Sequence, residues 1–471
     1  DNLFVFLLIM ARFSVPRRYQ QELLMAGIIL ALLFRGIFIL LGAALIENFS
    51  WVFYIFGAFL IYTAIQQART GPHDEVETES KMLTWLRRRV AVTDTFDGAK
   101  IRTVIDGRKT FTPVLLVLVA LGTHPPLPED RLRALVGLDD RPATDLHPGL
   151  TLANHAWQDP DRLVRIGTIT EAELRVIASD RWHPSLGGDL PLRLNRAVLD
   201  ADHVVIVGPT FPHEVVGYSG GAKYLFPGVS GPEMIDVSHW LGALCGVVDT
   251  IGVVDTPVRA LIHAAARLVP TPCTLVGLVV RGDASLAGVF VGDLEAAWRA
   301  AAARSAREHV VTVDRPMHRV LSCAPPMYDE LWTAAKAMYK LEPILADGAE
   351  LVIFAPHLDE VSRVHGADLA RVGYHVLPYF LHDWDRFASV PRAVLAHSTH
   401  VRGAGRVVDG VERPRVRVTL ASRVPRATCE ALGLGHLDPA SIDPADWAGR
   451  EHEGVLVVPK AGEQLHRLRE P

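Results

Sequence analysis

The sequence predicts a two-lobed α/β region with largely parallel sheets, preceded by an α-helical transmembrane segment. Two contrasts along the chain predict this class. The first 66 of the 471 residues are dense in Leu, Ile, Phe and Ala, whereas the remainder has an ordinary globular composition. From residue 124 onward, short apolar runs alternate with helical stretches, a pattern typical of parallel sheets covered by helices. We expect three parts, residues 1–110, 111–312 and 313–471, with a cleft between the last two.

The N-terminal part contains apolar runs that predict membrane-spanning helices. Residues 25–46 form a run of the length that a span requires, about 20 residues. The run Trp51–Ile65 is shorter, with aromatic residues near both ends. Basic residues precede the first run and follow the second, but none lies between them, so the positive-inside rule places both basic loops in the cytoplasm. Arg35 lies within a span, where it marks either a functional polar site or a buried ion pair.

The remaining elements follow from apolar periodicity. Lys100–Thr112 alternates around Asp106-Gly107 and predicts a cytoplasmic β-hairpin. The run Phe111–Gly122 is too short to cross a bilayer alone, and Leu115–Thr123 predicts a buried strand ending at His124. Leu294–His309 is rich in Ala and Arg and predicts a helix, and Ala421–Asp446 predicts a loop with short helices. Further buried strands are predicted at residues 204–209, 273–280, 318–325, 350–356 and 454–459.

Charge and cysteine content exclude several classes of function. The net charge of −5 and a pI near 6.5 argue against nucleic-acid binding. The four cysteines are far apart and show no C-x-x-C spacing. We therefore expect reduced thiols in a cytoplasmic compartment rather than a disulfide framework or a zinc site.

The residues that carry chemistry are concentrated in one block, Gly208–Trp240, which follows a predicted strand. It reads GPTFPHEVVGYSGGAKYLFPGVSGPEMIDVSHW. A Gly-rich turn after a strand allows backbone N–H groups to approach an anion. A nucleotide-binding P-loop is excluded because Lys223 follows Ala222 and precedes Tyr224, whereas that motif needs G-K-[ST].

This block resembles the nickel-pincer lactate racemase (LarA-type) family. The shared features are His213, the turn Ser219–Lys223, Pro227-Gly228 and a second histidine, His239. The motif ALGTH, which ends at His124, is also shared, and the resemblance extends from about Gly122 to the C-terminus. It implies a racemase or epimerase acting on a small 2-hydroxy carboxylic acid, with separate cofactor-maturation enzymes as partners.

The resemblance also implies roles for five residues. Lys223 corresponds to the lysine linked to the cofactor, a nickel-pincer nucleotide (pyridinium-3-thioamide-5-thiocarboxylic acid mononucleotide), and His239 to the histidine that ligates nickel. His124 and His213 correspond to the acid/base pair on the two faces of C2, a role that suits the histidine pKa. Lys336, in LWTAAKAM, corresponds to the lysine that holds the substrate carboxylate.

This sequence departs from the lactate-specific pattern in two places. Trp332 and Thr333 stand where lactate racemase has tyrosine and glutamine, so we expect a different or larger 2-hydroxy acid. The family also carries an Asp and Arg motif before the first strand, which is absent here, so we expect an incomplete site. Five other histidines fit surface or capping roles: His155, His183, His365, His397 and His400.

The first 123 residues resemble the TerC-type integral membrane family, which is linked to tellurite resistance and metal-ion export. Long stretches match, including VTDTFDGAKIRTVIDGRKTFTPVLLVLVALGT, but only the first of two acidic intramembrane motifs is present, as Asp1-Asn2. Three hypotheses follow. The chain is a membrane-tethered racemase with its catalytic region in the cytoplasm, a metal exporter with a regulatory domain, or an inactive join of two fragments at ALGT. If the join is not physiological, we expect the racemase part to be cytoplasmic.

Overall fold

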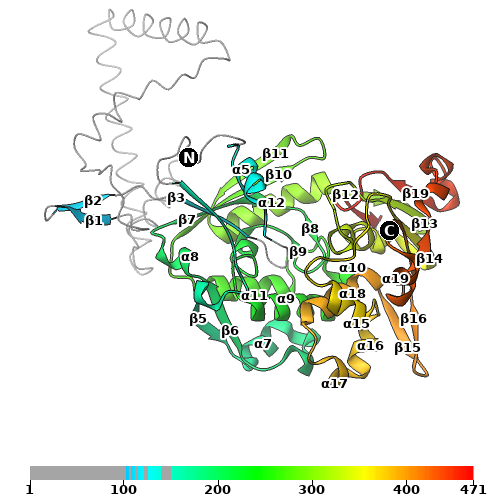
Figure 1. Ribbon diagram of the computed structural model, residues 1–471, viewed down its shortest axis with the longest axis horizontal. Helices are drawn as coiled ribbons and strands as arrows, with labels where there is room; N and C mark the ends of the chain where they lie inside the picture. The colour runs from blue at the N-terminus through cyan, green and yellow to red at the C-terminus, as the bar shows by residue number, and fades with distance from the viewer. Residues whose placement is uncertain (1–101, 106–107, 112–114, 121–125, 139–149, 470–471) are drawn as a thin grey trace, which may run out of the picture. The chain divides into compact units, whose positions relative to one another are not determined.

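A computed structural model describes residues 102–105, 108–111, 115–120, 126–138 and 150–469 (Figure 1). The chain divides into two units between Val90 and Ala91, and the first unit lies outside the described residues. The predicted membrane runs, Arg35 and His124 also lie outside them. None of the helices in the described part of the chain combines the length and the apolar character that crossing a membrane requires.

The predicted hairpin at the start of the described chain is confirmed. Strands β1 (Arg102–Ile105) and β2 (Arg108–Phe111) pair in antiparallel register, with Thr103 opposite Thr110. The run after it also forms a strand, β3 (Leu115–Val119), which pairs in parallel with β4 (Leu150–Asn154). The expectation that this strand is buried is wrong, because β4 is its only strand partner among the described residues and Leu116 is 40% exposed.

A three-stranded sheet supports the motif block. Its order is β11 (Leu286–Gly292), β10 (Cys273–Val280) and β7 (Val204–Pro209), with β7 parallel and β11 antiparallel to β10. Helix α12 (Leu294–His309) covers β10 and β11, with the predicted bounds. The prediction that β7 is fully buried is wrong. Its side chains alternate, and Val205 and Val207 on its open face are 59% and 60% exposed.

The second large sheet is wholly parallel, as the apolar runs predict. Its order is β18 (Gly435–Leu437), β17 (Arg417–Ser422), β14 (Leu345–Ala355), β13 (Met317–Cys323) and β19 (Val455–Val458). Every neighbouring pair is parallel. Parallel sheets are normally covered on both faces, which is why these strands are continuous apolar runs rather than alternating ones.

The other elements are short and connect these sheets. The strands are β5 (Leu163–Ile169), β6 (Leu190–Asn195), β8 (Pro212–His213), β9 (Gly217–Tyr218), β12 (Val310–Val313), β15 (Gly405–Val408), β16 (Val411–Pro414) and β20 (Leu465–Leu468). The α-helices are α5 (Glu129–Leu135), α7 (Glu171–Ala178), α8 (Arg196–Asp200), α9 (Pro232–Cys245), α10 (Val247–Thr250), α11 (Pro257–Ala266), α13 (Leu331–Ala334), α14 (Lys336–Tyr339), α15 (Gly366–Val372), α16 (Leu377–His382), α17 (Trp384–Phe387), α18 (Arg392–Arg402) and α19 (Arg426–Ala431). Strand β12 pairs in parallel with β20.

A continuous apolar core joins the regions around the two larger sheets and brings α9 against α18 (Figure 1). The Ala393 backbone N–H donates to the Asp236 carboxylate over 3.1 Å, and Trp240 stacks on Trp384 with ring centroids 5.3 Å apart. This packing places a C-terminal helix beside the motif block. The four cysteines are free thiols, as expected from their spacing.

Candidate active site

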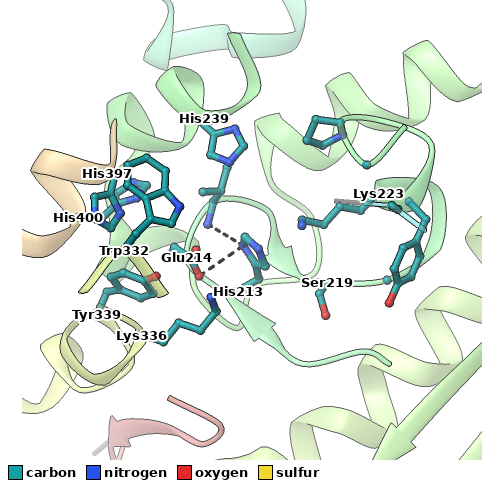
Figure 2. Close-up of a pocket in the computed structure, with 16 residues that line it drawn as sticks. His213, Glu214, Ser219, Lys223, His239, Trp332, Lys336, Tyr339, His397 and His400 are labelled. Carbon is teal, nitrogen blue, oxygen red and sulfur yellow. Dashed lines mark hydrogen bonds and ion pairs between the residues drawn. The ribbon is translucent and has the colours of Figure 1, made fainter. Parts of the chain in front are cut away.

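Four of the five sequence-predicted site residues line one pocket (Figure 2). His213, Lys223, His239 and Lys336 face a cavity of about 170 Å³, together with residues that the sequence analysis did not select. His124 lies outside the described residues, although Ala120, at the end of the strand that leads to it, lines the same pocket. The pocket therefore joins residues from distant parts of the sequence.

The turn that presents Lys223 is built from backbone that few residues adopt. Gly220 has φ +82° and ψ −177°, a conformation accessible essentially to glycine alone. The buried Arg259 guanidinium supports the turn by donating to the Gly220 carbonyl over 3.2 Å and to the Tyr218 carbonyl. Arg259 also lies 3.9 Å above the centroid of the Trp298 ring. The Gly-rich sequence is needed here for the shape of the turn.

Lys223 occupies a setting that favours a neutral amine. Its pKa is lowered to about 8, chiefly by burial; Glu214 opposes this shift, whereas the charges of Arg259 and Lys336 add to it. Within the described chain its Nζ makes no hydrogen bond and no ion pair. An uncharged primary amine without a competing partner is the form that reacts with an activated carboxyl or thiocarboxyl group.

His239 is held as a neutral imidazole with one defined tautomer. Its Nδ1 lies 2.6 Å from the Ile235 carbonyl oxygen, one helical turn earlier in α9, and therefore donates to it. Burial lowers the pKa of His239 to about 4. The lone pair is consequently on Nε2, which is the arrangement of a metal-ligating histidine.

His213 can adopt either of two tautomers (Figure 2). Its Nδ1 accepts the Val215 backbone N–H over 3.1 Å, which leaves the proton on Nε2 as a donor. The same Nδ1 lies 3.5 Å from Glu214 Oε2, so a proton on Nδ1 would be stabilised by that carboxylate and Nε2 would become a base. Burial holds the pKa of His213 well below its usual value, so the neutral ring dominates.

Glu214 is the main charged residue that the sequence analysis missed. Burial raises its pKa, but His213 and Lys336 outweigh burial and keep the carboxyl ionised, with the pKa well below its usual range. His213 has the largest lowering effect on this pKa, and Lys336 has the next largest. The one sequence signal for Glu214 was its position directly after the motif histidine His213.

The structure contradicts the predicted surface position of three histidines that lie in or near the far wall of the pocket. His365, His397 and His400 are not surface residues: their exposed fractions are 8%, 6% and 4%. His397 stacks on Trp332 with centroids 3.9 Å apart, and His365 stacks on the same ring at 4.3 Å. His397 and His400 line the pocket from α18. The sequence signal that could have identified His397 and His400 was their spacing of three residues, which places both side chains on one helix face.

Of the other two histidines, His183 has the expected capping role, whereas His155 is buried and not on the surface. Buried His155 interacts through Nε2 with the Ser230 carbonyl at 2.9 Å and through Nδ1 with the Asn195 amide at 3.0 Å. His183 accepts the Ser185 backbone N–H over 3.1 Å and so caps a short 3₁₀ helix.

The donor set fits a metal that brings most of its own ligands. Within the ranges that the structure describes, no group of three or more His, Cys, Asp or Glu side chains is placed to hold a metal ion. His239 offers one neutral nitrogen, and Lys223 offers an amine for covalent attachment in the same pocket. These residues fit an anchored organic cofactor that supplies the other metal ligands.

Comparisons with known proteins identify two regions of similarity. Residues 1–123 match the integral membrane protein TerC family, and residues 185–246 match the lactate racemase N-terminal domain. An uncharacterized membrane protein of Mycobacterium tuberculosis is 40% identical over 143 residues, which cover 29% of this chain and 36% of the relative. A Myxococcus xanthus membrane protein is 37% identical over 119 residues, covering 25% of this chain and 37% of the relative. The chain thus spans little more than a third of these relatives, and the matches support membrane association.

Two solved structures resemble the described region. A crystal structure of a Thermotoga maritima protein has 27% sequence identity and a TM-score of 0.69, covering 76% of this chain and 86% of its own. The lactate racemase apoprotein of Thermoanaerobacterium thermosaccharolyticum has 16% identity and a TM-score of 0.56, covering 75% and 78%. The C-terminal region has a lactate-racemase-like fold. This likeness confirms the mixed α/β architecture.

Proposed function

We propose that this chain is a racemase or epimerase of 2-hydroxy acids that uses a nickel-pincer nucleotide attached to Lys223. The observation that carries the proposal is the convergence of Lys223, His239, His213 and Lys336 in one pocket, on a lactate-racemase-like fold. Three of these residues lie in one motif block, but Lys336 is nearly one hundred residues beyond the end of that block in sequence.

The Lys223 amine and the His239 imidazole would hold the cofactor. The lowered pKa of Lys223, about 8, favours the neutral amine needed for the link, and the free Nε2 of His239 is available to nickel. When bound, the cofactor would supply reversible hydride chemistry at C2 of the substrate. The chain itself must bind the acid, orient C2 and move the hydroxyl proton.

His213 would move that proton on one face of C2. With Nδ1–H directed to Glu214, its Nε2 can remove the hydroxyl proton as the C2 hydride leaves, which gives a 2-keto acid. With Nδ1 accepting the Val215 N–H, its Nε2–H can return a proton to the carbonyl oxygen in the reverse step. His124 would perform the same exchange on the opposite face. Neutral histidines suit both directions.

Lys336 would bind the substrate carboxylate. It begins α14 and lines the pocket beside His213 and Glu214. A single ammonium there orients a small carboxylate without forming a bidentate clamp. Glu214 would repel the carboxylate from its own position, so the two charges together define one orientation of the acid.

The TerC match favours a second candidate, a membrane metal-ion transport protein whose C-terminal region is regulatory. Under the first proposal, the same N-terminal part tethers the catalytic region to the membrane, with that region in the cytoplasm. Deletion of the gene separates the two candidates. A transporter predicts altered sensitivity to metal ions, whereas the racemase proposal predicts lost interconversion of hydroxy-acid stereoisomers with unchanged metal tolerance.

A direct test produces the full chain together with cofactor-maturation enzymes and measures bound nickel and interconversion of 2-hydroxy-acid stereoisomers. We expect nickel in the wild type, none in Lys223→Ala, and a strong reduction in His239→Ala. Lys460→Ala, which changes an exposed lysine, is the matched control and should retain wild-type nickel. Equal nickel in the Lys223→Ala and Lys460→Ala variants would overturn the proposal.

A further inference from the structure

The pocket wall farthest from Lys223 is polar. It is formed by Trp332, Tyr339, His397 and His400, which we call the distal wall (Figure 2). Of the described residues that line the pocket, only Ala120, Val215 and Pro227 carry aliphatic side chains, and none of these belongs to the distal wall. A pocket selective for an alkyl side chain would present apolar surface there instead.

Two imidazole nitrogens of the distal wall lack hydrogen-bond partners. His397 Nε2 and His400 Nε2 are buried and make no hydrogen bond within the described part of the chain, although both residues are more than nine-tenths buried. Buried polar atoms are nearly always paired, and leaving one unpaired is unfavourable. Both residues line the pocket, so a polar ligand there can supply the missing partners.

The charges of the pocket favour hydroxyl groups over a second carboxylate. Burial lowers the pKa of His400 to about 4 and that of His397 well below its usual value, so both rings are uncharged. Glu214, which lies beside Tyr339, is ionised. With Lys336 occupied by the first carboxylate, a second one would meet the Glu214 anion and two uncharged imidazoles among the described residues here. A hydroxyl group, in contrast, can donate to a carboxylate and can donate to or accept from a neutral imidazole.

We infer that the substrate is a polyhydroxy acid, with hydroxyl groups on C3 and beyond that hydrogen-bond to His397, His400 and Glu214. The inference rests on the proposed function for the position of C2, with the carboxylate at Lys336 and the remaining chain along the distal wall. It names the substrate class of that site. Sites built to bind a hydroxyl group reject analogues that lack it far more strongly than apolar pockets reject an added group.

The test compares two acids of equal chain length, D-gluconate and 2-hydroxyhexanoate. Binding to the full-length apoprotein, purified in detergent, is measured by isothermal titration calorimetry, which needs no cofactor. We expect gluconate to bind at least about 30-fold more tightly, because the alkyl chain leaves both imidazoles unpaired. Equal binding, tighter binding of 2-hydroxyhexanoate, or no binding of gluconate would overturn the inference.

Substitutions of His397 and His400 test whether these side chains cause the preference for gluconate. His397→Phe and His400→Phe keep an aromatic ring but remove the nitrogens, and each should weaken gluconate binding about tenfold while leaving 2-hydroxyhexanoate unchanged or improved. His452→Phe changes an exposed histidine, with 73% of its side chain exposed, and should have no effect. If the distal variants weaken both acids equally, the wall has a structural role and the inference fails. The two-acid comparison on the wild type does not depend on whether the variants fold.

Failure of this inference and failure of the proposed function give different results. Selective gluconate binding by the apoprotein, with no stereochemical change by the nickel-loaded protein, would leave the substrate class intact and refute the racemase proposal. Interconversion of lactate stereoisomers without gluconate binding would support the racemase proposal and refute the polyhydroxy acid.

Discussion

Replacing Gly220 with alanine tests whether the turn before Lys223 depends on glycine. Its φ of +82° and ψ of −177° cost a residue with a Cβ about 1–3 kcal/mol. The added Cβ would also lie 2.5 Å from Thr210 Oγ1 and 3.3 Å from the Pro209 carbonyl oxygen. Overpacking of this kind costs about 1–3 kcal/mol, so the free energy of unfolding should fall by about 2–6 kcal/mol.

Gly373 is the matched control because it has nearly the same backbone conformation, with φ 78° and ψ −176°. A Cβ there would meet only the end of the His375 side chain, at 3.2 Å, and a backbone oxygen at 3.7 Å. Gly373→Ala should therefore show the backbone cost alone, about 1–3 kcal/mol. The difference between the two variants isolates the contact with Thr210.

Urea unfolding of both variants and of the double variant Gly220→Ala/Thr210→Ala measures this contact. Thr210 Oγ1 is buried and makes no hydrogen bond within the described chain, so Thr210→Ala removes the clash without unpairing another group. We expect the second substitution to restore about 1–2 kcal/mol of the loss from the first. If Gly220→Ala and Gly373→Ala destabilise equally, or if Thr210→Ala restores nothing, the reasoning is refuted.

Three further predictions concern charge. Because the pKa of Lys223 is lowered to about 8, roughly half of its amine is neutral at pH 8. Labelling by an acylating reagent followed by peptide mass spectrometry should therefore show a midpoint near pH 8 for Lys223, and a pH-independent yield would contradict this. Arg259→Met should destabilise the protein by about 3 kcal/mol, because two carbonyls lose a charged donor. The substitution should also raise the Lys223 labelling midpoint, since a nearby positive charge is removed. An unchanged midpoint would contradict this reasoning. Glu214→Gln should slow substrate interconversion about 10- to 100-fold and alter its pH profile, because the Nδ1–H tautomer of His213 loses its acceptor. Glu214→Asp should recover part of the rate. A Glu214→Gln variant with wild-type rate and pH profile would exclude this role of Glu214.

The sequence by itself determined the local elements and selected four residues that line the pocket. Leu294–His309 forms the predicted helix, and the apolar runs at residues 273–280 and 350–356 form strands in the predicted places, because periodicity and length are local properties. Lys223 and His239 could be selected because the motif places both within one block. Their lowered pKa values were not predictable, since burial of each side chain depends on packing.

Tertiary structure alone decided how deeply the strands are buried and what completes the pocket. Residues 204–209 form an apolar run, yet Val205 and Val207 are exposed, because apolar composition does not show whether a second layer covers the sheet. His397 and His400 are polar and lie in a helix far along the chain, so local rules assign them to the surface. They line the pocket because the packing of α18 against α9 brings that helix beside His213 and Glu214, a long-range contact that no local pattern encodes.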